Sequence, residues 1–383
     1  MTTYDLDALR RREYPWAAAG ETIFLNHAST GAMPQRTVDA LAEWARLRAN
    51  PERISHDFQF GTLARARELT ARLIGAHAGE IALATNTSYG VNLAAFSLPL
   101  GPGDVVLTPD LEFPANVYPW MAAAERRGFA YRRIPLENGI ADTETVLAAI
   151  EAAGVRALSV SWVGFATGAK LDLAVLGDAC RERGIYFIVD AIQGLGACTL
   201  DLARVHVDIL ACGAQKWLLS PWGAGFVYVR DALVRALEPY DVSWLDVRDS
   251  DDFTRLLHYD MTWRDDARRF EFVTVPFQDY AGMVTSLELL LELGAESVES
   301  HIRSLVDRVV AWCDARDGVE LLTPADPSRR AGIVCIKPRD ARAASERLGE
   351  HHVAHSLREG AIRLAPHCYN TKEEIDRALA LIG

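Results

Sequence analysis

The strongest constraint in this sequence is a regular alternation of short apolar runs with amphipathic stretches that have helical spacing. Apolar runs rich in β-branched residues occur at 80–84, 104–108, 130–136, 156–163, 185–190, 207–211 and 226–229. Helical stretches lie between several of them, for example at 114–127, 143–153 and 173–183. The run 186–189 is apolar on both faces, which is typical of a strand that helices cover on both sides. Alternation at this pace predicts an α/β unit with a mostly parallel sheet and right-handed crossovers.

The pattern changes after about residue 235. The stretch 241–266 is rich in Asp, Arg and Trp without clear periodicity, and it predicts a loop excursion. Two long helices are then expected at 279–294 and 295–316. Short strands at 319–322, 332–337 and 361–365 and helices at 341–348 and 372–381 complete a smaller predicted α+β unit.

Composition and charge disfavour several classes of protein. Of the 383 residues, 50% are hydrophobic and 24% are charged, which is typical of a folded chain. The formal charge of −12 argues against nucleic acid as a partner, because proteins that bind it neutralise phosphates with Lys and Arg. We expect no membrane partner either, since the first residues lack a signal-like apolar core and no stretch approaches the ~20 apolar residues of a membrane span.

The cysteines and histidines predict no metal site. The six cysteines contain no CxxC pair, so we expect reduced thiols and a cytoplasmic location. The histidines at 351, 352 and 355 lack a partnering carboxylate motif, and an exposed histidine run is the simpler interpretation.

Several polar residues follow predicted strands, where ligands of open parallel sheets bind. Thr87 and Ser88 open a predicted helix that begins near Gly90. Free N–H groups and hydroxyls at such a position can hold a phosphate, although a plain helix cap is the commoner use of these residues when they are taken alone.

Asp190 and Lys216 end neighbouring strands of the predicted sheet and lie 26 residues apart. A carboxylate such as Asp190 needs a cationic partner, which could be a protonated heterocyclic nitrogen or a metal, or the amides of an ordinary turn. Lys216 is followed in the sequence by Trp217 and Trp222. Loss of hydration there would free its amine as a nucleophile, although a surface lysine is the commoner case.

Together these residues describe a site for pyridoxal 5′-phosphate. Thr87 and Ser88 provide the phosphate cradle, and Phe113 provides a flat apolar face after another strand. Asp190 would keep the ring nitrogen protonated, and Lys216 would bond to the aldehyde and move the proton of the substrate α-carbon.

At these residues the sequence resembles the class V aminotransferase family of fold-type I enzymes, which includes cysteine desulfurases, isopenicillin N epimerases and kynureninases. The resemblance covers nearly the whole chain, from the opening Phe24-Leu25-Asn26-His27-Ala28-Ser29-Thr30-Gly31 to the closing segment around Arg363. It implies a fold-type I transferase with an N-terminal arm at 1–20, a large cofactor-binding domain at 21–277 and a small C-terminal domain at 278–383. It also implies a homodimer, in which 240–277 reaches toward the partner subunit.

The resemblance implies a role for each matching position. Lys216 is the Schiff-base lysine, and Asp190 is the partner of the pyridinium nitrogen. The other implied cofactor-binding residues are Thr87 and Ser88 for the phosphate, Phe113 for stacking, Gln193 for the ring hydroxyl, Gln215 beside the lysine, and Thr274 for the phosphate of the neighbouring subunit. Arg363 would hold the substrate carboxylate in a bidentate fit. His27 is a candidate for substrate contact, or it could cap a local turn.

The sequence departs from the family pattern at four places. Gly213 and Gln215 stand where the family often has Ser or Thr and then His on the phosphate, so that grip is weaker or made by amides. Gly164 and Phe165 stand where an Asn or Gln would reach the cofactor, which leaves that contact to Gln193. Val273 replaces a glycine. Phe113 replaces the histidine of desulfurases and cannot transfer protons.

The implied activity is chemistry at the amino group or α-carbon of an amino acid. Transamination is the favoured reaction, because beside Phe113 the amine of Lys216 alone would shuttle the proton. A C–S lyase like the cysteine desulfurases, or an enzyme like isopenicillin N epimerase, is the alternative. A persulfide-forming desulfurase is disfavoured, since 353–360 contains no cysteine. The departures at Gly213, Gly164 and Val273 also allow a non-catalytic protein that binds the cofactor.

Overall fold

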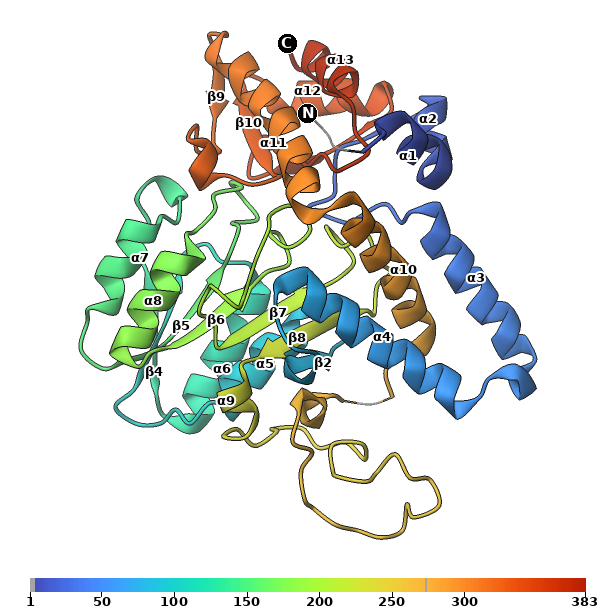
Figure 1. The fold of residues 1–383 in the computed structure, drawn as a ribbon. Coiled ribbons are helices and arrows are strands. Elements are labelled where there is room, and N and C mark those ends of the chain that lie inside the picture. Colours follow the sequence, from blue (N-terminus) through green and yellow to red (C-terminus); the bar gives the residue numbers. More distant parts are fainter. Residues whose placement is uncertain (1–3, 273) are drawn as a thin grey trace.

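In a computed structural model of the chain, which describes residues 4–272 and 274–383, a seven-stranded sheet forms the centre of the larger unit (Figure 1). Its strand order is β2-β8-β7-β6-β5-β3-β4. The strands are β2 Ile81–Leu83, β3 Val105–Pro109, β4 Ala130–Ile134, β5 Val155–Ser161, β6 Tyr186–Asp190, β7 Ile209–Gly213 and β8 Gly225–Val229. Only β8 runs against its neighbours, so the predicted α/β unit with a mostly parallel sheet is confirmed.

Helices cover both faces of this sheet. α5 (Thr87–Ser97) and α6 (Tyr118–Arg127) lie on one face, and α7 (Thr143–Ile150) and α8 (Leu173–Arg183) on the other (Figure 1). Alternate residues of β6 enter the two cores: Phe187 and Val189 pack with α8, whereas Ile188 packs with α5. This two-sided burial explains why the run 186–189 contains no polar residue.

A second group of helices flanks the sheet beside β2 and β8. α10 (Phe277–Leu293) packs against α3 (Gln35–Ala49) and α4 (His56–Ile74). The short helix α9 (Asp231–Val234) follows β8. Between α9 and Ala267 the described chain contains no helix or strand, only the isolated bridge of Val247 with Trp263, as the predicted loop excursion requires. Short 3-10 turns occur at Pro51–Arg53, Ala78–Glu80, Pro114–Asn116, Glu137–Gly139, Ala267–Phe270 and Pro327–Arg329.

The smaller unit is built on an antiparallel sheet with the order β12-β13-β10-β9. Its strands are β9 Val319–Leu321, β10 Val334–Pro338, β12 Ser356–Arg358 and β13 Ala361–Leu364, and its helices are α11 Ala295–Asp314, α12 Ala341–Glu350 and α13 Lys372–Ile382. The sequence pattern did not predict β12, because the strand has three residues and two of them are exposed.

The N-terminal segment is joined to this smaller unit. Helices α1 (Leu6–Glu13) and α2 (Pro15–Ala19) precede β1 (Ile23–Phe24), which pairs in parallel with β11 (Val353–Ala354). Arg10 forms an ion pair of 2.8 Å with Glu374 of α13. The domain limits at residues 20 and 277 stay predictions.

None of the helices in residues 4–272 and 274–383 combines the length and the hydropathy that a membrane span requires.

The close approach of α5 to the sheet depends on a glycine. A Cβ atom at Gly90 would lie 2.6 Å from Cβ of Ala211 on β7 and 2.8 Å from Cγ2 of Val227 on β8. Only a residue without a side chain therefore allows α5 to rest directly on these strands, with its first turn at their ends.

We expect Gly90→Ala to lower the free energy of unfolding by about 1–3 kcal/mol, because the added methyl group overpacks this contact. Gly61→Ala is the matched control: it lies inside α4 with no atom within 4 Å of an added Cβ, so the higher helix propensity of alanine should be neutral or stabilising. Urea denaturation of the two variants measures the difference, and equal stabilities would contradict the packing argument.

Candidate active site

The predicted pair of Asp190 and Lys216 lies at the carboxyl ends of β6 and β7. Asp190 is the last residue of β6, where it pairs with Ser161 and Ala211 of the adjacent strands. Lys216 follows the end of β7 by three residues. Asp190 is 3% exposed, and its Oδ1 accepts a hydrogen bond of 3.0 Å from the N–H of Ile192.

Burial shifts the pKa values of both groups toward neutrality. It raises the pKa of Asp190 to about 6, against the N–H of Ile192 and the charge of Lys216, which lower it. Burial also lowers the pKa of Lys216 to about 8, whereas the carboxylate of Asp190 raises it. Near neutral pH, a much larger fraction of Lys216 than of an ordinary lysine is therefore an uncharged, nucleophilic amine.

The first turn of α5 joins the same edge of the sheet. The helix begins at Thr87, not near Gly90 as expected, because the side chain of Asn86 caps it by accepting from the N–H of Tyr89. The N–H groups of Thr87 and Ser88 therefore remain outside the helical hydrogen bonds. Thr87 is buried and its hydroxyl accepts from the N–H of Gly213 at 2.9 Å, whereas Ser88 is exposed.

The side chain of Gln215 occupies the space that a side chain at position 213 would fill. A Cβ atom at Gly213 would lie 2.5 Å from Oε1 of Gln215. That Oε1 atom is buried and has no hydrogen-bond partner among the described residues. The side chain of Gln215 thus folds back over residue 213 and presents an unsatisfied polar group next to Lys216.

Phe113 provides a flat surface beside the amine. The Nζ atom of Lys216 lies 5.8 Å from the centre of the Phe113 ring, which is 47% exposed. Phe165 meets this ring edge-on, with 5.3 Å between the ring centres. Two aromatic side chains therefore stand where the family pattern led us to expect one stacking ring and an amide.

Arg363 brings a buried positive charge from β13 of the smaller unit. Its Nη1 donates to the carbonyl of Phe165 at 3.0 Å, and its Nη2 donates to Oγ of Ser29 at 2.8 Å. Within the described chain, Nε is buried without a hydrogen-bond partner and no carboxylate pairs with this guanidinium. Burial lowers the pKa of Arg363 below its usual value. The site therefore contains a cation that no described carboxylate neutralises.

His27 and Gln193, the other two predicted residues at this edge of the sheet, already have hydrogen-bond partners. Nδ1 of His27 donates to the carbonyl of Ala365 at 2.9 Å, and the hydroxyl of Tyr369 donates to Nε2 at 3.0 Å. Burial and the neighbouring His367 hold the pKa of His27 well below its usual range. Substrate contact by His27 stays a prediction, and it requires one of these bonds to open.

The amide of Gln193 bonds at both ends. Its Nε2 donates to the carbonyl of Ala28 at 3.0 Å, and its Oε1 accepts from Nε1 of Trp217 at 2.9 Å. These bonds fix the segment after β6 to the segment after Lys216. The predicted contact of Gln193 with a ring hydroxyl stays a prediction.

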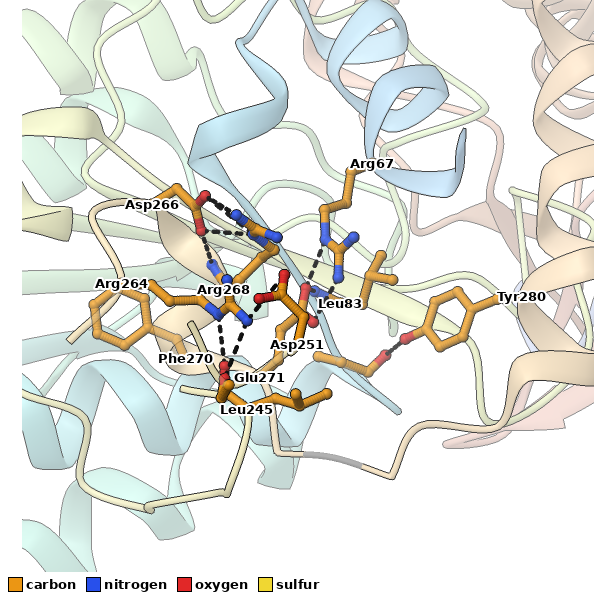
Figure 2. A network of polar contacts seen from close by, with 12 residues as sticks. Arg67, Leu83, Leu245, Asp251, Arg264, Asp266, Arg268, Phe270, Glu271 and Tyr280 are labelled. Carbon is orange, nitrogen blue, oxygen red and sulfur yellow. Dashed lines mark hydrogen bonds and ion pairs between the residues drawn. The ribbon is translucent and has the colours of Figure 1, made fainter. Parts of the chain in front are cut away.

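Thr274 is exposed and makes no described hydrogen bond with the residues around Lys216. The segment before it is firmly attached to the sheet (Figure 2). Glu271 accepts from Nε and Nη2 of Arg67 at 2.8 and 2.6 Å and from the N–H of Leu83 at 2.9 Å. Within the predicted intersubunit segment 240–277, Glu271 is thus fixed to β2. Val273 lies outside the described residues.

Sequence reasoning missed a second carboxylate near Asp190. Glu112 immediately precedes Phe113 and accepts from the N–H of Ser161 at 2.7 Å and from the hydroxyl of Ser161. Burial raises the pKa of Glu112 to about 7 despite these bonds, and the charge of Asp190 adds to the rise. Its position three residues after the buried strand β3 was the available signal.

Comparison with known proteins places this geometry in a family. The sequence model of the family "Aminotransferase class-V" matches residues 23–378. An isopenicillin N epimerase of Streptomyces clavuligerus is 32% identical over 92% of both chains. A probable cysteine desulfurase of Methanothermobacter thermautotrophicus is 28% identical over 95% of this chain and 94% of its own. The solved structure of the cystine C–S lyase C-DES with its product cysteine persulfide has a TM-score of 0.87, with 24% identity over 97% of this chain and 99% of that chain.

We expect the amine of Lys216 in the cofactor-free protein to become reactive as the pH rises through about 8, well below its ordinary pKa of 10.5. Asp190→Asn should move this midpoint lower, because the lost negative charge no longer favours the protonated amine. Acetylation of Lys216 across pH, read by mass spectrometry, gives both midpoints. A midpoint near 10 in the unchanged protein would contradict the burial argument.

Gly213→Ser should weaken retention of pyridoxal phosphate although the family often has a hydroxyl at this position, because in this chain the new side chain collides with Gln215 and displaces it. The double variant Gly213→Ser, Gln215→Ala should recover part of the loss, since it empties that space. Gly101→Ser is the control, because an added Cβ there meets no atom within 4 Å. Release of the cofactor on dilution, followed by fluorescence, measures retention, and a double variant as weak as the single one would refute the shared-space argument.

Proposed function

The chain belongs to the aminotransferase class-V family, whose members are pyridoxal-phosphate enzymes, and on that basis we propose that it transfers the amino group of an amino acid. The observation that most supports this proposal is the pair of Asp190 and Lys216, a buried carboxylate and a partly buried amine at the ends of adjacent strands. The residues around this pair fit the cofactor: the first turn of α5 offers free N–H groups, Phe113 offers a ring face, and Oε1 of Gln215 is a buried polar atom that no described residue bonds.

When bound, the cofactor withdraws electrons from the α-carbon of an amino acid and so stabilises negative charge there. The role of Asp190 is to keep a proton on the ring nitrogen, because a buried carboxylate favours a positively charged partner. The role of Lys216 is to attach the cofactor and then, as a free amine, to carry the proton of the α-carbon on its Nζ.

The groups around Phe113 support transamination over a reaction that needs a second base. Phe113 and Phe165 cannot carry protons. Both nitrogens of His27 are hydrogen-bonded, and the carboxylate of Glu112 faces Ser161. Lys216 is then the one described group near the ring face that is suited to moving a proton, as a transaminase with a single acid–base group requires.

Arg363 supports an amino acid as the substrate. Its guanidinium is buried and lacks an acidic partner among the described residues, so a substrate carboxylate would supply the missing negative charge. The bonds to Phe165 and Ser29 hold the guanidinium in place before the substrate arrives, which reduces the entropy lost on binding.

The cysteines bear on the desulfurase alternative. All six are buried, and burial raises the pKa of Cys368, the one nearest the closing segment in sequence, to about 12. A thiol of this kind is a poor acceptor of sulfur, because the thiolate is the reactive form. This supports a reaction without a protein persulfide.

Epimerisation or C–S cleavage is the second candidate. It is favoured by the relative named isopenicillin N epimerase, the more similar of the two relatives described above, and by the relative named a probable cysteine desulfurase. Both reactions need the same charge stabilisation at the α-carbon and differ in the bond or proton that moves next.

We also propose a homodimer in a cytoplasmic setting, in which Thr274 contacts the phosphate bound by the partner copy. The attachment of the preceding segment to β2 through Glu271, together with the exposure of Thr274, supports this reach. Light scattering of the purified holoenzyme should give twice the mass of 42.2 kDa, and a monomer would contradict the proposal.

The reaction is tested by adding a panel of amino acids to the holoenzyme. Formation of a keto acid together with a change in cofactor absorbance is the expected result. Sulfide release from cysteine would replace the proposal by a lyase, and inversion without keto acid would replace it by an epimerase. Bound cofactor that no amino acid perturbs would indicate a non-catalytic binding protein.

Lys216→Ala should lower turnover by at least about 10²–10⁴-fold, because proton transfer and cofactor attachment are both lost. Lys170→Ala, in the loop between β5 and α8, is the matched control and should keep the activity of the unchanged enzyme. Keto acid production measures both variants, and full activity of Lys216→Ala would rule out the mechanism.

A further inference from the structure

A second arginine lies on the same face of the small sheet as Arg363. β12 and β13 form an antiparallel hairpin in which Ser356 pairs with Arg363 and Arg358 pairs with Ala361. Directly opposed residues, and residues two apart on one strand, point to the same face of a sheet. Arg358 is therefore the diagonal neighbour of Arg363 on that face.

Contacts of the hairpin show that this face is turned toward the site. Oγ of Ser356 donates to Oδ1 of Asn26 at 2.8 Å, and Arg363 donates to Oγ of Ser29. The segment 26–29 in turn contacts Gln193 through the carbonyl of Ala28. Arg358 thus lies on the same site-facing surface of the hairpin as Arg363, nearer the hairpin turn.

Arg358 is exposed, and no ion pair with a carboxylate is described for it in residues 4–272 and 274–383. The adjacent Glu359 belongs to the tight turn, with a φ of 46°. Burial is the main cause of the lowered pKa values of Lys216 and Arg363, and the charge of Arg358 lowers both further. Its guanidinium therefore lies within electrostatic range of both groups.

These positions leave an excess of positive charge at the site. Lys216, Arg358 and Arg363 lie near two described carboxylates: Asp190 would pair with the ring nitrogen of the cofactor, and Glu112 is hydrogen-bonded to Ser161. One substrate carboxylate would neutralise Arg363 and leave Arg358 without a partner. A second acidic group on the substrate would complete the balance, and guanidinium groups bind carboxylates in a bidentate fit.

We propose that Arg358 binds the side-chain carboxylate of the substrate, so that the enzyme prefers dicarboxylic amino acids such as aspartate and glutamate. This specificity rests on the proposed function, since it assigns the substrate class of the same site. Arg363 binds the α-carboxylate of the substrate, and Arg358 binds the carboxylate at the end of its side chain.

The test titrates the holoenzyme with glutamate and with norvaline, a neutral amino acid of similar length, and follows the absorbance of the bound cofactor. We expect glutamate to bind about 10- to 100-fold more tightly than norvaline. Arg358→Gln should remove this preference, weakening glutamate by a similar factor while leaving norvaline nearly unchanged. Arg342→Gln, an equal change of charge on the exposed face of α12, should leave both affinities unchanged.

Equal affinity for the two amino acids, or equal weakening of both by Arg358→Gln, would overturn the specificity proposal while leaving the reaction proposal intact. If no amino acid perturbs the cofactor, a second measurement tests the dicarboxylate site independently of the proposed reaction. Glutarate, but not pentanoate, should raise the melting temperature of the holoenzyme, and Arg358→Gln should abolish that rise. A rise that depends on Arg358 would support the dicarboxylate site without the reaction, and its absence would overturn the site.

Discussion

The site depends on a carboxylate and an amine held near each other where water is scarce. Asp190 and Lys216 occupy this position because β6 and β7 are parallel neighbours whose carboxyl ends meet at one edge of the sheet. Burial raises the pKa of the acid and lowers that of the amine, so both groups titrate near neutrality. A carboxylate suited to a positively charged ring and an amine suited to attack follow from the same low-polarity surroundings.

Two contacts between distant segments complete the site around this pair. Gly90 lets α5 lie directly on β7 and β8, and the hydroxyl of Thr87 then bonds to the N–H of Gly213 beside the lysine. From the smaller unit, Arg363 reaches the carbonyl of Phe165 and the hydroxyl of Ser29. Arg363 is therefore positioned by the larger unit and the N-terminal segment as well as by its own strand.

The departures from the family pattern are coupled rather than independent losses. Gly213 lacks a side chain where Gln215 folds back, so the two residues share one space and present one unsatisfied oxygen. Phe165 removes an expected amide, yet it packs edge-on against Phe113 and its carbonyl accepts from Arg363. At both places the departure from the family pattern is thus accompanied by a change at a neighbouring residue of the site.

The sequence alone determined the α/β sheet, because apolar runs and helical spacing are local properties, and it determined that Asp190, Lys216 and Thr87 belong to strand ends. It could not predict the bonds of His27, whose partners Ala365 and Tyr369 lie more than 300 residues away. The role of Glu112 beside Ser161, and the short strand that carries Arg358, were likewise decided by tertiary structure. Contacts between distant segments set the burial of a residue and the register of its strand. Burial in turn shifts the pKa values, and register decides which residues lie on the same face of a sheet.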